Sequence, residues 1–200
     1  MNETVRLLQA HHSSRSYKTD PIPEEILEAI IECAHRAPTS TNSQEVSLVV
    51  VRDAAKRARI AEIAGGQPWI AQAPVFIAVI VDFYKTGLGV EKAGAAQVFQ
   101  RSLEGILAAV SDVGIAMATL MTAARAFGLG IVPIGGIRRD PQAMIDLLDS
   151  LLASGRWQNQ QLSSDIECTA VVIRTQDVHR KKKRREFVRN SLGQVDGGLG

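Results

Sequence analysis

The stretch 97–127 constrains the fold most, because it reads as one long helix that is apolar around most of its circumference. Ala, Leu, Met and Ile dominate it, and a helix of this kind has to be covered on nearly all sides. It is therefore either the spine of a domain or part of a subunit interface. Ser111 and Asp112 interrupt its most apolar part, 106–124, and an unpaired carboxylate at mid-span is costly in lipid. We expect a buried helix and no membrane span.

The rest of the chain alternates helical patterns with short β-branched runs, which predicts a layered domain of mixed α and β structure. Helices are expected over about 23–36, 53–64 and 140–148, and strands over 46–51, 75–81, 131–134 and 169–173. The run 46–51 is too apolar for an exposed strand, so we expect it in the sheet interior. Gly87 and Gly89 are expected to mark a loop. Cys33 lies on the apolar side of its helix and is expected in the core.

Length and composition fit one compact domain or two small ones, because 46% of the 200 residues are hydrophobic. The two cysteines are too few for a disulfide scaffold or a four-ligand zinc site, and no secretory signal is recognisable. We therefore expect a cytoplasmic protein without a bound metal. Residues 174–189 hold eight basic and two acidic side chains, including the basic run 180–185. Any affinity for nucleic acid would come from this segment, which we expect to be solvated rather than a specific site.

The motifs of several common catalytic classes are missing from the sequence, among them the serine-hydrolase elbow, the P-loop and the zinc-binding helix pair. What stands out instead is a set of loops rich in neutral hydrogen-bonding groups, with one arginine. The loops contain His11, Ser13, Arg15, Thr39, Ser40, Asn42, Gln67 and the turn 135–138. Arginine can hold a phosphate bidentately, and glycines let backbone N–H groups approach a ligand closely. The loops therefore suit a planar, polar ligand that carries a phosphate.

Four segments together resemble a known family. They read HHSSR at 11–15, APTSTNSQ at 37–44, GQPWIAQAP at 66–74 and IGGIR at 134–138. In this order and spacing they are similar to the FMN-dependent nitroreductase and flavin reductase family, above all to its oxygen-insensitive, NADPH-preferring branch. The resemblance implies that residues 1–149 form an FMN-binding domain, and it leaves 150–200 as a divergent C-terminal segment.

The resemblance also implies an α+β fold, with a mostly antiparallel central sheet flanked by helices and a homodimer whose interface contains the long helix. FMN would lie at that interface. The residues that the resemblance places around FMN are His11, Ser13, Arg15, Ser40, Asn42, Gln67, Ile134, Gly135 and Gly136. The first three would hold the phosphate, the ribityl chain and the pyrimidine side of the flavin. The next two would come from the other subunit, Gln67 would hydrogen-bond to the ring, and the last three would lie along its face.

The implied activity is that of an FMN-dependent NAD(P)H oxidoreductase. NADPH or NADH would reduce FMN and leave, and a nitroaromatic, a quinone or free flavin would then be reduced at the same site by a ping-pong mechanism. The cofactor itself carries this chemistry, so we name no catalytic residue. Arg15 is expected to stabilise negative charge on the flavin. Two alternatives stay open: a flavin-binding protein of the same fold with impaired turnover, and an anion- or nucleic-acid-binding protein that acts through the basic run.

Overall fold

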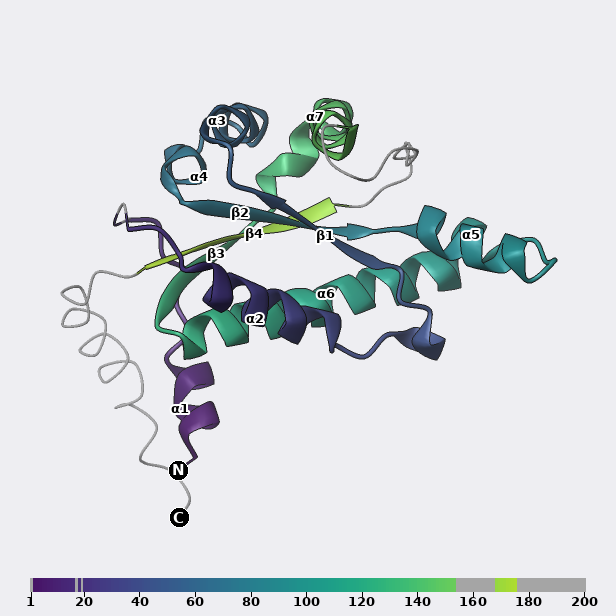
Figure 1. Ribbon diagram of the computed structural model, residues 1–200, viewed down its shortest axis with the longest axis horizontal. Coiled ribbons are helices and arrows are strands. Elements are labelled where there is room, and N and C mark those ends of the chain that lie inside the picture. The colour runs from purple at the N-terminus through teal and green to yellow at the C-terminus, as the bar shows by residue number, and fades with distance from the viewer. Residues whose placement is uncertain (1, 17, 19, 154–167, 176–200) are drawn as a thin grey trace, which may run out of the picture.

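An antiparallel sheet lies between two layers of helices in the computed structural model, which describes residues 2–16, 18, 20–153 and 168–175 (Figure 1). The strands are β1 (Val46–Val51), β2 (Val75–Val81), β3 (Leu129–Ile134) and β4 (Cys168–Thr175). The helices are α1 (Glu3–Gln9), α2 (Glu24–His35), α3 (Ala54–Ile63), α4 (Pro68–Gln72), α5 (Phe83–Lys92), α6 (Leu103–Ala126) and α7 (Pro141–Ala153). Short 3-10 turns are η1 (Ser40–Asn42), η2 (Phe99–Arg101) and η3 (Gly136–Arg139). The expected α+β architecture with an antiparallel sheet is confirmed.

The described strands are arranged in the order β1-β2-β4-β3, and every neighbouring pair is antiparallel. Every residue of β2 is buried, as expected for a central strand. β1 lies at an edge of the described sheet, so the expectation of an interior strand is wrong. Its apolar side chains are partly covered by helices on both faces, which accounts for their hydrophobicity without a second neighbouring strand. β4 comes from beyond residue 149 and completes the sheet; the division into domains at that residue stays a prediction.

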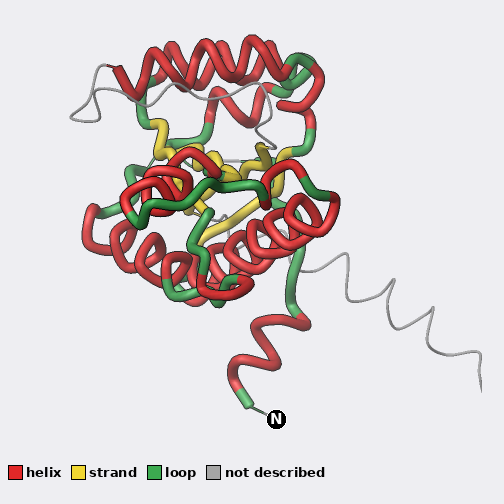
Figure 2. Tube along the Cα trace, turned by 90° about the vertical axis from the view of Figure 1, so that its right-hand side faces the viewer, coloured by secondary structure: helices red, strands yellow, loops and turns green. Residues whose placement is uncertain are grey.

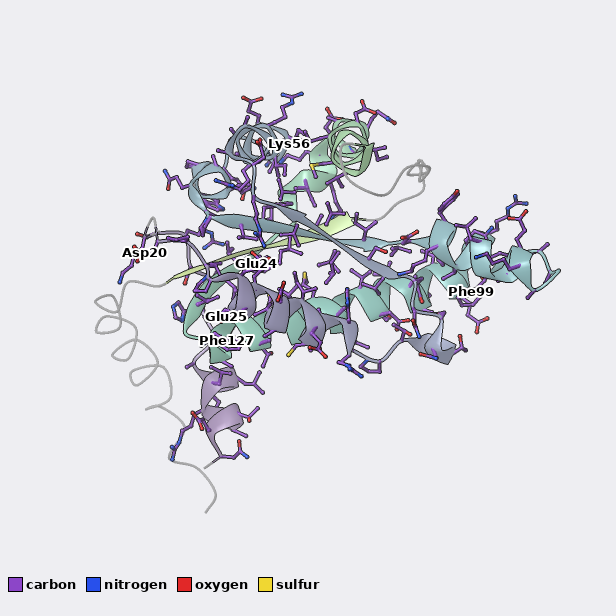
Figure 3. All side chains as sticks on the ribbon, in the orientation of Figure 1. Asp20, Glu24, Glu25, Lys56, Phe99 and Phe127 are labelled. Carbon is purple, nitrogen blue, oxygen red and sulfur yellow. The ribbon has the colours of Figure 1, made fainter. Side chains whose placement is uncertain are left out.

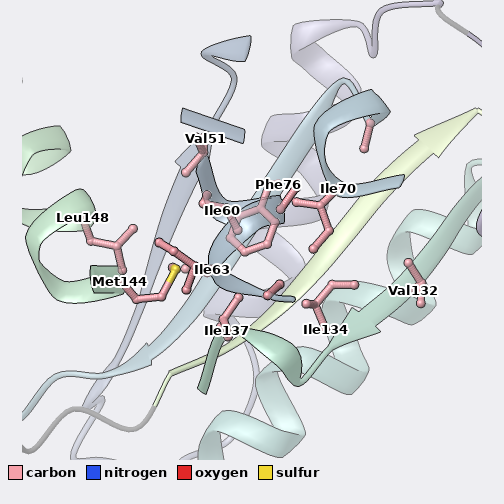
Figure 4. Close-up of a cluster of buried hydrophobic side chains, with 14 of the residues drawn as sticks. Val51, Ile60, Ile63, Ile70, Phe76, Val132, Ile134, Ile137, Met144 and Leu148 are labelled. Atoms are coloured by element: carbon pink, nitrogen blue, oxygen red, sulfur yellow. The ribbon is translucent and has the colours of Figure 1, made fainter. Parts of the chain in front are cut away.

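The two faces of the sheet are covered by different helices (Figures 1 and 2). α3, α4 and α7 lie on one face, where Phe76 of β2 is fully buried among aliphatic side chains (Figure 4). α2 and α6 pack together on the other face, and their core includes Ile30 and Leu120. Cys33 of α2 is exposed, so its expected place in the core is wrong. It lies outside the buried stripe of α2, which is formed by Leu27, Ile30 and Ala34.

The long helix α6 begins at Leu103 and not at residue 97, because Ser102 ends the preceding 3-10 turn and caps the helix. The Ser102 hydroxyl accepts a hydrogen bond from the Gly105 N–H at 3.0 Å. Gly105 is needed there, since a Cβ at this position would lie 2.0 Å from the carbonyl oxygen of Phe99. Phe99 and Phe127 mark the two ends of the helix in Figure 3. By length and composition alone α6 would suffice to cross a membrane, yet it packs along α2 and the sheet.

The segment after β2 is a helix, α5, so the expectation of a loop around Gly87 and Gly89 is wrong. Asp82 caps this helix by accepting a hydrogen bond from the Lys85 N–H at 2.9 Å. The Gln97 side chain also ties its first turn down, because its Nε2 donates to the carbonyl oxygen of Phe83. The basic run 180–185 lies outside the described residues.

Candidate functional site

The segment that carries His11, Ser13 and Arg15 is fastened to the fold at two points. The Ser14 N–H donates to the carbonyl oxygen of Ile131 in β3 at 2.9 Å, and Ser14 is buried. The Arg125 guanidinium at the end of α6 donates to the carbonyl oxygen of Ala10 at 2.9 Å. The three predicted ligand-binding side chains next to these attachments are exposed. The segment therefore presents its polar side chains outward from a fixed backbone.

Arg15 and Gln67 are brought together through the short helix α4. The guanidinium carbon of Arg15 lies 5.7 Å from the centre of the Trp69 ring, within the range of a cation–π interaction. Gln67 precedes α4 by one residue, and its Nε2 donates to the carbonyl oxygen of Ala64 at 2.9 Å. This bond uses only part of the hydrogen-bonding capacity of the amide. A fixed cation and a fixed amide thus lie at the same end of the sheet.

The turn that follows β3 packs directly on Gln67. A Cβ added to Gly136 would lie 2.5 Å from Nε2 of Gln67 and 2.6 Å from the carbonyl oxygen of Ala64, so only glycine allows this approach. Gly135, beside it, is exposed. Ile134 is 2% exposed and belongs to the core, so its side chain supports the turn from inside and is not presented at the surface.

Ser40 and Asn42 lie elsewhere, against the middle of α6. The Ser40 N–H donates to Oδ2 of Asp112 at 2.7 Å, whereas the segment before His11 is attached to Arg125 of the same helix. Thirteen residues of helix separate these two attachments, which is about 20 Å along the axis. Within one chain, therefore, the structure assembles the N-terminal segment, Gln67 and the 134–136 turn, and leaves the 40–42 turn apart.

Two residues that help to build the site were given no role by the sequence. Trp69 provides the ring over which Arg15 lies, and Arg125 holds the backbone next to His11. A tryptophan in the same motif as Gln67 is a visible signal, since its ring offers a face to a nearby cation. Arg125 gives no such signal, because an arginine in the last turn of a helix usually faces solvent and the negative end of the helix dipole.

The assembled groups fit a flavin mononucleotide in kind. Arg15 offers an exposed, pre-oriented guanidinium for an anionic or carbonyl-rich edge, and Gln67 offers an amide for a heterocyclic ring. Gly136 allows the turn to pack closely on Gln67 and Ala64, and the Arg138 guanidinium lies beside Gly135, 3.0 Å from where a Cβ would stand. Among the described residues, no cluster of His, Cys, Asp and Glu suits a metal ion.

The sequence profile of the nitroreductase family matches residues 8–153. The chain belongs to the nitroreductase family. Over 150 residues this nitroreductase-family chain is 42% identical to the FMN reductase (NAD(P)H) of Bacillus subtilis, a match that covers 74% of the chain and 60% of that relative. It is 32% identical over 148 residues to the NADPH-flavin oxidoreductase of Vibrio harveyi, covering 74% of the chain and 60% of the relative. The chain thus spans about three fifths of the length of the relatives it matches.

Solved structures of the same family have the same fold as this chain. NfrA2 of B. megaterium superposes with a TM-score of 0.81 at 35% identity, covering 92% of this chain and 70% of that one. The NADPH:FMN oxidoreductase of Vibrio harveyi complexed with NAD+ superposes with a TM-score of 0.77 at 25% identity, covering 100% and 80% of the two chains. The nitroreductase-like fold predicted from the four motifs is confirmed.

Proposed function

We propose that this chain binds FMN and is an NAD(P)H-dependent oxidoreductase of the nitroreductase and flavin reductase type. The observation that carries the proposal is the convergence of Arg15, Gln67 and Gly136, three predicted flavin-binding residues from three distant parts of the sequence, at one end of the sheet. The names of the relatives, which include FMN reductase and NADPH-flavin oxidoreductase, support the same activity.

Each group at the site has a distinct task in this proposal. Arg15 places a positive charge beside the pyrimidine edge of the ring, where it stabilises negative charge. Gln67 orients the ring through its amide, and the 134–136 turn lies along the face of the ring. His11 and Ser13 bind the phosphate and the ribityl chain. FMN, when bound, supplies the hydride and electron transfer between NAD(P)H and a nitroaromatic, a quinone or free flavin, so the chain needs no acid or base of its own.

A homodimer completes the site in this proposal, and α6 supports it. One face of α6 exposes large apolar side chains at helical spacing: Leu103, Ile106, Leu107 and Val110, with exposures of 72, 40, 58 and 40%. Contiguous apolar surface of this kind marks an interaction site on a protein. A second copy on this face would cover it and would bring its own 40–42 turn to the Arg15 cluster, which the turn of the same chain does not reach. We place the dimer in the cytoplasm.

Leu107→Glu is expected to convert the dimer to a monomer, because it places a charge at the centre of the apolar face of α6. An unpaired buried charge should raise the dimer dissociation constant at least ~100-fold. Sedimentation velocity over a concentration series measures this constant. Ala58→Glu, on the exposed side of α3, is the matched control and should leave it unchanged. A Leu107→Glu protein as dimeric as the wild type would show that α6 is not the interface.

Gly136→Ala is expected to weaken FMN binding about 30-fold, because the new methyl group displaces Gln67 and the backbone at Ala64. Gly89→Ala, whose Cβ would meet nothing within 4 Å, is the control. FMN fluorescence quenching gives both affinities. Equal quenching by the two variants would mean that the turn does not contact the ring.

The activity itself is tested by the colour of the purified protein and its response to NADPH. The protein should carry, or take up, yellow FMN, and anaerobic NADPH should bleach the flavin absorbance. Bound FMN that stays oxidised would support a flavin-binding protein with impaired turnover. A protein that remains colourless after FMN is added would contradict the proposal. The remaining alternative would then be a protein that binds anions or nucleic acid through the basic run.

A further inference from the structure

Two buried carboxyl groups have no task in the proposed activity. Glu45, just before β1, is 1% exposed, and Asp112 of α6 is 4% exposed; both carboxyls bind the same short turn, Asp112 at the Ser40 N–H and Glu45 at the Ser43 hydroxyl. Oε2 of Glu45 accepts a hydrogen bond from the Ser43 hydroxyl, while Oε1 is enclosed and has no donor. Ionised carboxylates only accept hydrogen bonds, so a proton carried by one of the two groups is the donor that is missing.

The pair anchors the loop 39–44 to α6. Asp112 accepts the Ser40 N–H at 2.7 Å, and the Ser43 hydroxyl, which donates its one hydrogen to Glu45, also lies 2.8 Å from the carbonyl oxygen of Ser40. Three residues of this loop other than glycine have positive φ: Thr41 (52°), Asn42 (55°) and Gln44 (55°). Asn tolerates such backbone, but it is unfavourable for Thr and Gln and persists there only where surrounding contacts enforce it. The two carboxyls are the point at which the loop is attached to the body of the protein.

Among the described residues, none of the ion pairs involves Glu45 or Asp112. Lys85, at the neighbouring β2–α5 junction, interacts electrostatically with Glu45 and Asp82, but its ammonium donates hydrogen bonds to the carbonyl oxygen of Val46 at 2.9 Å and to the Ser47 hydroxyl at 3.2 Å. The Asp82 carboxylate accepts from Ser47 and caps α5. The loop 39–44 has no titratable side chain, and the positions three and four residues from Asp112 in α6 are alanine or isoleucine. His35 and Arg36, at the end of α2, are exposed.

Protonation of the pair depends on pH in a defined direction. Burial raises the pKa of Asp112; the Ser40 N–H lowers it, and the adjacent Glu45 raises it again. Because this pKa is higher in the folded chain than in the unfolded one, the folded chain holds the proton over a wider pH range. Stability from the protonated pair is therefore complete below the ordinary pKa of an aspartate and is lost as the pH rises through the raised value.

We propose that Glu45 and Asp112 share one proton and act as a positioning pair, which holds Ser40 and Asn42 in the geometry in which they reach the flavin bound by the partner subunit. Loss of the proton leaves two adjacent buried negative charges, whose repulsion loosens the loop from α6. The contact of Ser40 and Asn42 with the flavin rests on the proposed function. The shared proton and the anchoring of the loop do not depend on it.

Hydrogen exchange of the loop 39–44 tests the anchor without FMN. In the wild type, protection of these amides, corrected for the intrinsic pH dependence of exchange, should fall about tenfold between about pH 4, the ordinary pKa of an aspartate, and about pH 9. Asp112→Asn keeps an acceptor for Ser40 and gains a donor for Glu45, so its protection should stay constant; Glu45→Gln should behave alike. Asp112→Ala should be unprotected throughout. Asp53→Asn, a change in the exposed cap of α3, should retain the wild-type pH dependence.

FMN affinity over the same pH range tests the positioning role. The dissociation constant should rise about tenfold in the wild type and stay level in Asp112→Asn. Wild-type protection that does not change with pH, or Asp112→Asn as unprotected as Asp112→Ala, would overturn the shared proton. Equal pH dependence of FMN binding in wild type and Asp112→Asn would overturn the positioning role. A chain that binds no FMN at any pH contradicts the proposed function and leaves the exchange comparison intact.

Discussion

Arg15→Ala is expected to weaken FMN binding about 100-fold, the largest loss from any single side chain at the site. The guanidinium is held over Trp69 and exposed toward the ligand, so little ordering is required when it forms charge-assisted hydrogen bonds. Alanine removes the charge and the donors together. Arg15→Lys keeps the charge but lacks the planar set of donors, so its FMN affinity should lie between those of the wild type and Arg15→Ala. Isothermal titration of the apoprotein with FMN measures all three affinities.

Arg36→Ala is the matched control for this prediction. Its guanidinium pairs with Glu32 on the surface of α2, where the Arg36 side chain is 81% exposed. FMN affinity should be unchanged in this variant, and so should the unfolding transition. If Arg15→Ala bound FMN as tightly as Arg36→Ala, the cation over Trp69 would not lie at the flavin, and the assignment of the site would have to be given up.

Phe76→Ala is expected to lower the free energy of unfolding by about 3–5 kcal/mol. Phe76 is fully buried in β2, between α3, α4 and α7, and removal of its ring leaves a cavity lined by aliphatic side chains that are themselves fixed in helices (Figure 4). Chemical denaturation followed by circular dichroism measures the loss. Phe127→Ala removes the same ring from a position that is 47% exposed, and it should cost less than about 1 kcal/mol.

An equal loss in the two phenylalanine variants would contradict the assignment of β2 to the centre of the sheet. The comparison also requires that the m-value, the slope of the unfolding free energy against denaturant concentration, is unchanged in both variants. A changed m-value would show that the substitution had altered the denatured or native state more broadly.

Much of this fold was predictable where one local signal acted alone. The β-branched runs at 46–51 and 75–81 are strands, as predicted. The spacing of Ile and Leu in 23–36 correctly predicts α2, and α3 begins directly after Asp53, where a helix was expected. The errors fall where tertiary contacts outweigh local preference. Glycines suggested a loop in α5, which a cap at Asp82 and the Gln97 side chain hold as a helix. A continuous apolar run suggested an interior strand for β1, whose cover comes from helices.

The residues of the candidate site were predictable from the sequence, but the residues that hold them in place were not. Arg15, Gln67 and Gly136 were expected at one ligand, and the structure brings them together; their roles toward FMN remain proposals. Trp69 received no role, because its contact with Arg15 joins residues more than fifty positions apart. Asp112 was visible as the charge that interrupts an apolar helix, but Glu45 comes from a different part of the chain, and only the folded chain shows that both carboxyls bind the 40–43 turn.

The place of β4 between β2 and β3 also governs how this protein emerges from a ribosome. Until translation passes residue 175, the edges of β2 and β3 that face β4 stay unpaired, and both strands are strongly apolar. Unpaired apolar edges invite association between nascent chains. The nascent chain should therefore need chaperone protection until β4 has left the ribosome.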